Sequence, residues 1–232
     1  MKRLFTCICF FVITEISIAQ ISIQTGFSAG FNVHSFTVND EQSFLRDGNG
    51  LEATLGVPVE ISYKKWSLQT GFYSNHLTLS YYFRTENRQY GFENSSINGI
   101  NTFKIPFLFS REFRRSNSRF GFSPHAGISW LTNRSKGQAG TGTASLGELT
   151  YTFTNSIVSK NKFLSELGID FNYRVFRNLT FYGGVTWSFG LQVIEELEFN
   201  YSILNRGDYT GTLKSRGSGQ HLHIGFKLPV YR

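Results

Sequence analysis

The sequence predicts an all-β fold: an eight-stranded antiparallel up-and-down transmembrane β-barrel that follows a cleaved N-terminal signal peptide. Three observations predict it. Eight segments alternate apolar and polar residues with the period of two that a strand requires. The connections between them alternate between long and short, as they do in barrels that span a membrane. The apolar positions carry no charge except Arg111, and a Lys or Arg that faces lipid at mid-membrane costs about 2–4 kcal/mol.

The N-terminus has the composition of a secretory signal peptide. Two basic residues precede the apolar stretch Leu4–Ile18, and the small residues at its end predict cleavage after Ala19. The predicted domains are therefore a signal peptide over residues 1–19 and a β-barrel over residues 20–232. This arrangement implies export to the outer membrane of a Gram-negative cell, with both termini of the barrel in the periplasm.

The composition excludes several classes of protein. The chain has 232 residues, and past the signal peptide it has no run of about 18 apolar residues, so no transmembrane helix is predicted. Both cysteines, Cys7 and Cys9, lie in the signal peptide, so the mature chain has no disulfide, thiolate zinc site or catalytic cysteine. The formal net charge of +7 is spread along the chain, so no nucleic acid partner is expected.

The first two predicted strands show the alternation clearly. Ile21–Ser35 places Phe27 and Phe31 opposite small and polar residues. Gly50–Tyr63 has apolar residues at every odd position from Leu51 onward and mostly polar or small residues at the even positions. A strand of roughly a dozen residues exceeds the usual length in soluble proteins but matches a tilted crossing of a bilayer.

The third and fourth strands follow the tight turn at Lys64-Lys65. Trp66–Arg84 continues the alternation, but its parity slips near Ser74–His76. One inserted residue would cause this slip, so the sequence predicts a β-bulge there. The fourth strand, Ile100–Phe113, has apolar side chains on one face from Phe103 to Phe109.

The last four strands repeat the pattern after further connections. They are predicted at Arg119–Leu131, Phe163–Val175, Leu179–Val193 and about 220–231. Their apolar faces are marked by Ile128, Ile169, Val185 and Ile224, with serine, histidine or charged residues between them. The eight strands together satisfy the even strand number of bacterial barrels.

The connections are predicted as three short turns and four long loops. The short turns are Lys64–Lys65, Arg114–Ser118 and Phe176–Asn178, and the long loops are Thr37–Asn49, Thr85–Gly99, Thr132–Asn161 and Ile194–Gly219. Within the third loop, Gly137–Gly147 is expected to be a flexible external loop, and Tyr151–Val158 is a segment that could extend a hairpin above the membrane.

Two features bear on whether the apolar faces meet lipid. Aromatic residues are expected in two interfacial belts, one near the short turns (Tyr63, Trp66, Phe113, Phe120, Phe176) and one near the long loops (Phe36, Tyr81, Tyr82, Trp130, Trp187). One observation argues against the barrel: all four prolines fall within predicted strands, at Pro58, Pro106, Pro124 and Pro229. Each removes a ladder hydrogen bond, so bulges or lumen water must compensate. The alternative fold is a secreted β-sandwich, which predicts shorter strands and less regular loops.

Several stretches resemble the small outer-membrane β-barrel proteins of Bacteroidetes, the PorT-like "porin family". The stretches are LGVPVEISYKKWSLQTGFYS, FKIPFLFSREF, FGFSPHAGISW, LGIDFNYRVFRNLTFYGGV and HLHIGFKLPVYR, and they cover nearly the whole mature chain. The resemblance implies an outer-membrane barrel, in a family that includes a barrel associated with type IX secretion. It implies no catalytic residue.

The inward positions are predicted to form a polar network in the lumen. An eight-stranded barrel is about wide enough for its side chains to fill, so a packed interior is expected and not an open pore. The acids and bases should pair with one another, because a buried charge without a partner is costly. The predicted network is Glu52, Glu60, Lys104, His125, Glu166, Asp170, Arg174, His221, His223 and Lys227.

The inward histidines leave a chemical alternative open. Alternate histidines on one strand, such as His221 and His223, can bind zinc or supply a base. Ser188 is a conceivable nucleophile, with Asp170 or Glu166 to orient the base, as in a lipid A-modifying enzyme of the outer membrane. The spacing does not require either site, so the prediction is no catalytic residue, no metal and no cofactor.

The predicted role is that of an integral outer-membrane protein with a structural function or with interactions made through its loops, chiefly Thr132–Asn161 and Ile194–Gly219. The expected partners are outer-membrane lipids and other envelope or secretion proteins, contacted through extracellular loops or periplasmic turns. The alternatives are a PorT-like component of a type IX secretion or gliding apparatus and a lipid A-modifying enzyme.

Overall fold

A computed structural model describes residues 21–48, 50–77, 80–84, 89–92, 100–133, 137–146, 148–159, 161–176 and 178–231. The predicted signal peptide, residues 1–19, lies outside this part of the chain. In the described residues, no helix has the length and apolar character needed to cross a membrane. Every regular element described is a β-strand.

Eight strands form a closed antiparallel barrel, as the alternation predicts. Around the barrel they lie in the order β1, β3, β4, β7, β9, β12, β13 and β15, and pairing of β1 with β15 closes it. Their bounds are Ile21–Asn39, Gly50–Tyr63, Trp66–Leu77, Ile100–Arg111, Phe120–Asn133, Asn161–Phe176, Leu179–Gly190 and Gly207–Tyr231. The short strand β8 (Phe113–Arg114) pairs with β9. The all-β barrel fold is thereby confirmed.

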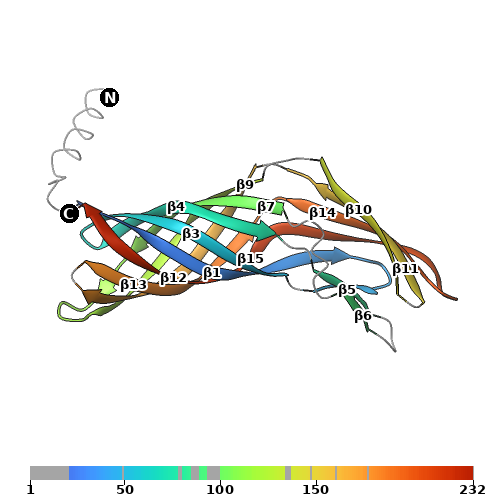
Figure 1. Cartoon of the computed structure of the whole chain (residues 1–232), viewed down its shortest axis with the longest axis horizontal. Coiled ribbons are helices and arrows are strands. Elements are labelled where there is room, and N and C mark those ends of the chain that lie inside the picture. Colours follow the sequence, from blue (N-terminus) through green and yellow to red (C-terminus); the bar gives the residue numbers. More distant parts are fainter. Residues whose placement is uncertain are drawn as a thin grey trace, which may run out of the picture.

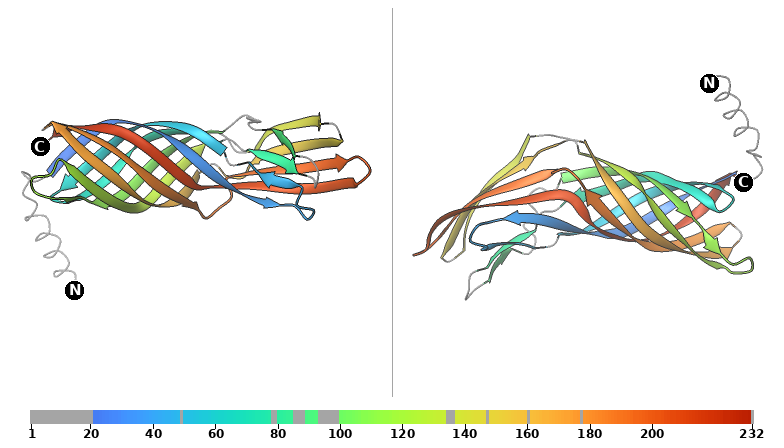
Figure 2. Two further views of the ribbon diagram at one scale, coloured as in Figure 1. Left: turned by 90° about the horizontal axis from the view of Figure 1, so that it is seen from below. Right: turned by 180° about the vertical axis from the view of Figure 1, so that it is seen from behind.

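The two ends of the barrel differ. At one end, called here the turn end, short turns join β3 to β4, β8 to β9 and β12 to β13, and the chain begins β1 and finishes β15 (Figure 1). The opposite end, called here the hairpin end, carries long strand extensions that continue well past the barrel wall (Figure 2).

The extensions at the hairpin end form a folded unit. The first part of β15 pairs with β14 (Glu195–Ile203), β14 pairs with β11 (Leu149–Ile157), and β11 pairs with β10 (Gly137–Leu146). A second small sheet contains β2 (Leu45–Asp47), β5 (Tyr81–Arg84) and β6 (Gln89–Phe92). These six strands, with the adjoining parts of β1 and β15, are called here the hairpin unit.

The hairpin unit has its own apolar core. Facing residues of β11 and β14 share rows across the sheet, such as Tyr151 opposite Tyr201, and β15 adds Tyr209 to that row. The aromatic rings of Tyr81 and Phe83 on β5 pack against this face, with Phe199 4.6 Å from Tyr81 between ring centroids. The buried cluster is Leu45, Tyr81, Phe83, Leu149, Tyr151, Leu197, Phe199, Tyr201, Ile203 and Leu213.

The outer wall of the barrel is apolar and exposed along every strand. This is the surface that a barrel needs in order to face hydrocarbon. At the turn end the guanidinium of Arg111 lies 4.9 Å from the ring centroid of Trp66 and 5.1 Å from that of Phe113. The outward apolar residues include Phe31, Leu51, Leu55, Phe72, Phe107, Ile128, Leu167, Phe171, Phe181, Leu222 and Ile224.

Three predictions about Trp66–Arg84 are wrong: its bulge, its end and the position of Tyr81. The predicted bulge near Ser74–His76 does not exist, because β4 keeps one unbroken register with β3 and with β7. The parity changes because β4 ends at Leu77 and Tyr81–Arg84 joins the other sheet, so Tyr81 lies in the core of the hairpin unit and not in an interfacial belt.

The long connections are also more ordered than predicted. Gly137–Gly147 was expected to be a flexible loop, but Gly137–Leu146 forms strand β10. Ile194–Gly219 was expected to be a charged loop, but β14 and β15 pair directly through most of it. The segment Tyr151–Val158 does extend a hairpin beyond the barrel, as β11.

Two of the four prolines coincide with irregular pairing. The β4–β7 ladder is interrupted between the pairs Gln69–Leu108 and Tyr73–Lys104, opposite Pro106. The register of β1 on β15 shifts next to Pro229. The N–H groups that Pro106 and Pro229 lack therefore fall where a ladder is interrupted or shifted. Pro58 and Pro124 pair with Gly71 and Ile169 in ladders that keep their register.

A second shift marks the rim of the barrel. The register of β1 on β15 changes between the pairs His34–Gly219 and Phe36–Ser215, so β15 carries two additional residues there. Gly217 lies in this bulge with a φ of 72°, a left-handed conformation that glycine adopts without a steric cost. At this point β15 leaves β13 and pairs with β14 instead.

Candidate functional site

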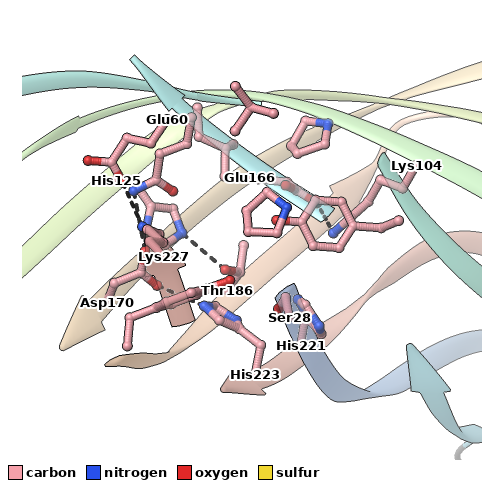
Figure 3. A pocket seen from close by; sticks show the side chains of 17 residues that line it. Ser28, Glu60, Lys104, His125, Glu166, Asp170, Thr186, His221, His223 and Lys227 are labelled. Carbon is pink, nitrogen blue, oxygen red and sulfur yellow. Dashed lines mark hydrogen bonds and ion pairs between the residues drawn. The ribbon is translucent and has the colours of Figure 1, made fainter. Parts of the chain in front are cut away.

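The lumen contains most of the charged residues of the barrel. The inward positions alternate with the lipid-facing ones, so each strand contributes polar side chains to the interior. Figure 3 shows the middle of this interior, where side chains from β3, β7, β9, β12 and β15 meet.

Two lysine–carboxylate pairs cross the lumen. Lys104 Nζ on β7 donates to Glu166 Oε1 on β12 over 3.0 Å. Lys227 Nζ on β15 donates to Glu60 Oε2 on β3 over 2.6 Å. Both lysines are buried, and each pair joins strands that are far apart in the sequence. Neutralisation across the lumen is the arrangement in which buried charges are tolerated.

Glu166 accepts further hydrogen bonds. The hydroxyl of Ser129 donates to Oε2 over 2.7 Å, and the hydroxyl of Ser188 donates to Oε1 over 2.9 Å. With Lys104, three donors surround one buried carboxylate. The Ser188 hydroxyl therefore donates its hydrogen bond to Glu166, and its described contacts include no histidine.

Asp170 lies between two histidines. His223 Nε2 is 2.8 Å from Oδ1, and His125 Nδ1 is 3.7 Å from Oδ2. The other ring nitrogen of His125 is 3.0 Å from the hydroxyl of Thr186. The order hydroxyl, imidazole, carboxylate is that of a catalytic triad, but it is enclosed by the barrel wall beside a cavity of only about 40 Å³. Such a space holds about one to three waters and no acyl chain.

Of the other predicted residues, His221 lines the same cavity as these pairs, and Glu52 and Arg174 lie nearer the two ends of the barrel. Glu52 on β3 contacts His34 Nε2 over 3.2 Å, near the rim at the hairpin end. His221 is buried beside His223, with ring centroids 4.9 Å apart. Arg174 is exposed at the turn end, where it lines the mouth of the lumen. The structure thus brings Glu60, Lys104, His125, Glu166, Asp170, His223 and Lys227 together and leaves Arg174 outside that group.

Sequence reasoning missed several lumen residues. His34 was on the polar face of its strand but was not considered as a partner for Glu52. Thr186 and Asn32 are buried in the lumen, and the amide of Asn32 donates to Asn75 across it. Both residues alternate with apolar neighbours along their strands, and this alternation is the sequence signal that predicts an inward position.

The described residues contain no group of three or more histidine, cysteine, aspartate or glutamate side chains placed to hold a metal ion. His125, Asp170 and His223 are residue types that bind metals, but the two histidines lie next to different oxygens of the Asp170 carboxylate. His223 is within hydrogen-bonding distance of Asp170, whereas His125 lies at ion-pair distance from it.

Two more features lie at the hairpin end. A depression of about 450 Å³ is walled by polar and aromatic residues of β11, β14 and β15 and by the turn Asp40–Gln42, where Asp40 accepts a 2.8 Å hydrogen bond from the Tyr201 hydroxyl. Glu195 is buried beyond the barrel wall, and Asn155 Nδ2 donates to it over 2.6 Å. Burial, with a smaller effect from Glu52, raises the pKa of Glu195 to about 8.

Comparison with known proteins identifies the family. A family model described as an outer membrane protein beta-barrel domain matches residues 18–191. The chain belongs to this outer-membrane β-barrel family. Its location is therefore the outer membrane, and its closed barrel is the membrane-spanning part.

Solved structures with the same kind of barrel share little sequence with it. OprG from Pseudomonas aeruginosa is 11% identical, with 91% of this chain and 96% of that chain covered and a TM-score of 0.47. Neisserial surface protein A is 9% identical, with 90% and 96% covered and a TM-score of 0.47. A major outer membrane protein from Thermus thermophilus is 11% identical, with 90% and 98% covered and a TM-score of 0.46. These values transfer no property to this outer-membrane barrel, and a search of curated proteins found no match.

Proposed function

We propose that the protein is a closed outer-membrane barrel that anchors a folded interaction unit, with a structural or partner-binding role and no open pore. The observation that carries this proposal is the apolar core of the hairpin unit, in which residues such as Leu197 and Phe199 are fully buried. Flexible loops would not bury such residues. An ordered unit beyond the barrel offers a fixed surface on which a partner can dock.

The ion pairs of the lumen support the closed barrel. The pairs Lys104–Glu166 and Lys227–Glu60 lie inside the barrel. The ammonium of Lys104 lies near the ring of Tyr73, and that of Lys227 lies near the ring of Tyr182. An eight-stranded barrel of this kind is filled by its own side chains. Purified protein in planar lipid bilayers should therefore show no steady conductance. Stable single-channel steps of the native protein would contradict the closed lumen.

The free edge of the hairpin unit supports the interaction role. In the described part of the chain β10 pairs only with β11, and its sequence GQAGTGTASL contains no charge and no proline. Natural proteins usually protect such edges with charged residues or proline, because an unprotected edge can pair with another strand. A photo-crosslinking residue at Thr143, which is exposed on β10, should capture a protein partner in native membranes, whereas the same residue at lipid-facing Phe181 should capture none.

Double substitution with Thr141→Lys and Ser145→Lys, two exposed positions on either side of the crosslinking residue at 143, provides the matched test of that edge. The two lysines protect the edge by charge and should abolish the crosslink without changing the barrel. Capture that persists unchanged in this double variant, or a crosslink found only at Phe181, would contradict a role for β10.

The proposed orientation places the turn end and both termini in the periplasm and the hairpin unit outside the cell, after removal of a signal peptide over residues 1–19. Short turns on the periplasmic side support it. Because the mature chain would have no cysteine, single-cysteine variants can test it. Leu204→Cys should react with a membrane-impermeant maleimide on intact Gram-negative cells, and Ser116→Cys should react only after lysis. The reverse pattern would invert the orientation, and N-terminal sequencing that shows Gln20 first would identify the cleavage site.

Within this family we propose a PorT-like barrel as the narrower class. The support is the resemblance of the strand and turn sequences to that Bacteroidetes family, and the partners would be components of a secretion or gliding apparatus. The crosslinking experiment at Thr143 identifies them by mass spectrometry. A partner unrelated to secretion or gliding would leave the broader proposal in place and remove this narrower one.

We also propose that the protein is not an enzyme. The contacts of Ser188 with Glu166 and the enclosure of Thr186, His125 and Asp170 support this proposal. Deletion of the gene should leave the acyl-chain profile of lipid A unchanged. A change in that profile, restored by the native gene and not by Ser188→Ala, would support the lipid-modifying alternative instead.

A further inference from the structure

We propose that the mouth of the lumen at the turn end binds a phosphate-class oxyanion, held by the guanidinium groups of Arg114 and Arg174 beside the Lys64–Lys65 turn. This site adjoins the Lys227–Glu60 pair of the central cavity and does not depend on the hairpin unit. Its evidence is the space, the charge balance and the unsatisfied donors at this end of the barrel.

The space is a cavity of about 140 Å³ at the turn end. It corresponds to roughly ten waters at about 10–15 Å³ each, which is room for an oxyanion and part of its hydration shell. The walls come from strands on opposite sides of the barrel, including β1, β3, β4, β12 and β13. The cavity is therefore the lumen itself where it opens toward the turns.

The charges around this cavity do not balance. Five cationic side chains line it (Lys64, Lys65, Arg114, Arg174, Lys227) and two acidic ones (Glu60, Glu112), which leaves a formal charge of +3. Both acids are already engaged, Glu60 with Lys227 over 2.6 Å and Glu112 with Arg114 over 2.6 Å. The excess comes from Lys64, Lys65 and Arg174, which are exposed and form no ion pair with a described carboxylate, so the site offers positive charge to an anion.

Arg114 supplies donors that no protein group accepts. Its side chain is only 11% exposed, and one nitrogen, Nη2, contacts Glu112. Its Nε and Nη1 are buried and have no hydrogen-bond partner in the described part of the chain. Buried donors without an acceptor cost free energy. Because these two nitrogens have almost no accessible surface, the guanidinium must turn toward the cavity to donate to an anion. A phosphate oxygen is the acceptor that a guanidinium fork matches best.

The backbone fixes Arg114 in this position. Arg114 pairs with Gly121 on β9, and Gly121 pairs with Asn172 on β12, so the three residues form one row across the barrel wall. A Cβ on Gly121 would lie 3.0 Å from the Nε of Arg114. The absence of a side chain there leaves the space in which the guanidinium lies across the strand.

Arg174 lies two positions beyond this row on the same inward parity. Its N–H donates to the carbonyl of Arg119 over 2.9 Å, which holds the end of β12 against the preceding turn. Its side chain is exposed at the mouth and has no ion pair with a described carboxylate. A phosphate group in the cavity would be reached by Arg114 from within and by Arg174 from the rim.

The test is calorimetric titration of inorganic phosphate into the full-length mature protein, kept in an uncharged maltoside detergent. Native protein should bind with one-to-one saturation. Arg114→Gln and Arg174→Gln should each weaken binding about tenfold, the usual cost of one charge-assisted hydrogen bond. Arg206→Gln, the same substitution at the tip of the hairpin unit, is the matched control and should bind like the native protein.

A second arm separates a soluble anion from a lipid headgroup. Dihexanoyl phosphatidic acid, which is soluble and carries a phosphate monoester, is titrated in the same detergent. Binding tighter than that of inorganic phosphate indicates a headgroup at the rim, and equal or weaker binding indicates a soluble anion. Each variant must first show the gel migration of a folded barrel, and Arg174→Lys, which keeps the charge, should bind better than Arg174→Gln.

Absence of saturable phosphate binding by folded native protein would overturn the proposal. Equal loss in Arg206→Gln would also overturn it, because the effect would then follow net charge and not the site.

Discussion

Glu60, Glu166 and Asp170 are carboxylates inside the barrel, and each lies within hydrogen-bonding distance of a lysine or histidine nitrogen. Residues of this kind are stable in the interior only as long as their partners remain. The net gain from such a pair is small, but removal of one member leaves an uncompensated charge and costs about 3–5 kcal/mol. The lumen charges are thus coupled to the integrity of the barrel.

Lys227→Met should lower the free energy of unfolding by about 3–5 kcal/mol, because Glu60 would lose the ammonium 2.6 Å away. Urea unfolding of barrels reconstituted in lipid vesicles measures this change. The double variant Lys227→Met with Glu60→Gln should recover much of the loss. A single variant as stable as the native protein would show that Glu60 is not held in charged form by this pair.

Glu195 predicts a pH dependence of the hairpin unit. Burial raises its pKa to about 8 from the ordinary value of 4.5. Between those values the folded state binds the proton more tightly than the unfolded state, so the stability of the unit falls as pH rises across this window, by up to about 1.4 kcal/mol per pH unit. Below pH 4.5 both states are protonated and the difference vanishes.

Glu195→Gln should remove this dependence. The variant and the native protein should show equal amide exchange in β14 near pH 4.5, and the variant should be better protected at pH 8. Comparison of the two proteins at each pH cancels the intrinsic rate of exchange. A native protein as protected as the variant at the higher pH would mean that Glu195 ionises in the folded state without cost.

The inward parity of the charged residues was predictable from the sequence, but their partners were not. Alternation places Glu166 and Lys104 on the same side of the wall without any alignment of structures. Which lysine meets which carboxylate depends on the tilt and stagger of the strands, which no local pattern specifies. The pair His34–Glu52 was missed for the same reason, although both residues lay on polar faces.

At the scale of the elements, the hairpin unit is held by packing and the barrel wall by the segregation of charge. Strand β15 belongs to both, since its first part pairs with β14 and its last part pairs with β13. The hairpin unit and the barrel can therefore be perturbed separately, by a substitution in the core of the hairpin unit or by one on the lipid-facing wall of the barrel.

Phe199→Ala should unfold the hairpin unit and spare the barrel. Phe199 is 1% exposed and contacts Tyr81, Phe83 and Tyr151 through its ring, and loss of a buried phenylalanine costs about 3–5 kcal/mol. Limited proteolysis should release fragments cut within β10, β11 and β14, while β12 and β13 stay protected. Thr152→Ala, on the exposed face of β11, is the control. Equal resistance of native and Phe199→Ala proteins would contradict a cooperative core.

Leu167→Arg should impair insertion or folding of the barrel. Leu167 is 55% exposed on the lipid-facing side of β12, and an arginine at mid-membrane costs about 2–4 kcal/mol. Leu204→Arg, at the exposed tip of the hairpin unit, should fold like the native protein. The yield of folded protein on insertion into vesicles measures both, and equal yields would place Leu167 outside the hydrocarbon.

Six of the eight predicted barrel strands were found close to their predicted positions. The third ends early, at Leu77, and the last begins earlier than predicted, at Gly207. The elements that could not be predicted are those of the hairpin unit. Glycine and threonine in GQAGTGTASL are typical of loops, and only the pairing of β10 with β11 stabilises an extended chain there. Tyr81 and Phe83 alternate like lipid-facing residues, and their burial depends on a sheet whose other strands lie far away in the sequence.

At the scale of the whole molecule, a closed wall with no free strand edge in the membrane determines how the protein behaves in detergent. The closure of β1 on β15 gives the barrel a complete ring of backbone hydrogen bonds. Without boiling, the protein in dodecyl sulfate should migrate on gels at a position different from that of the boiled chain. Identical migration under conditions where the protein resists protease would contradict a closed barrel.

The pairing of β1 with β15 joins the first strand of the chain to the last, across almost the full length of the sequence. No shorter nascent portion can form this seam, since β15 is synthesised and exported after every other strand. Contacts of such large sequence separation slow folding, and until they form both outer strands present unpaired amides to the periplasm. The barrel wall can therefore close only when the twenty-five residues of β15 reach the first strand.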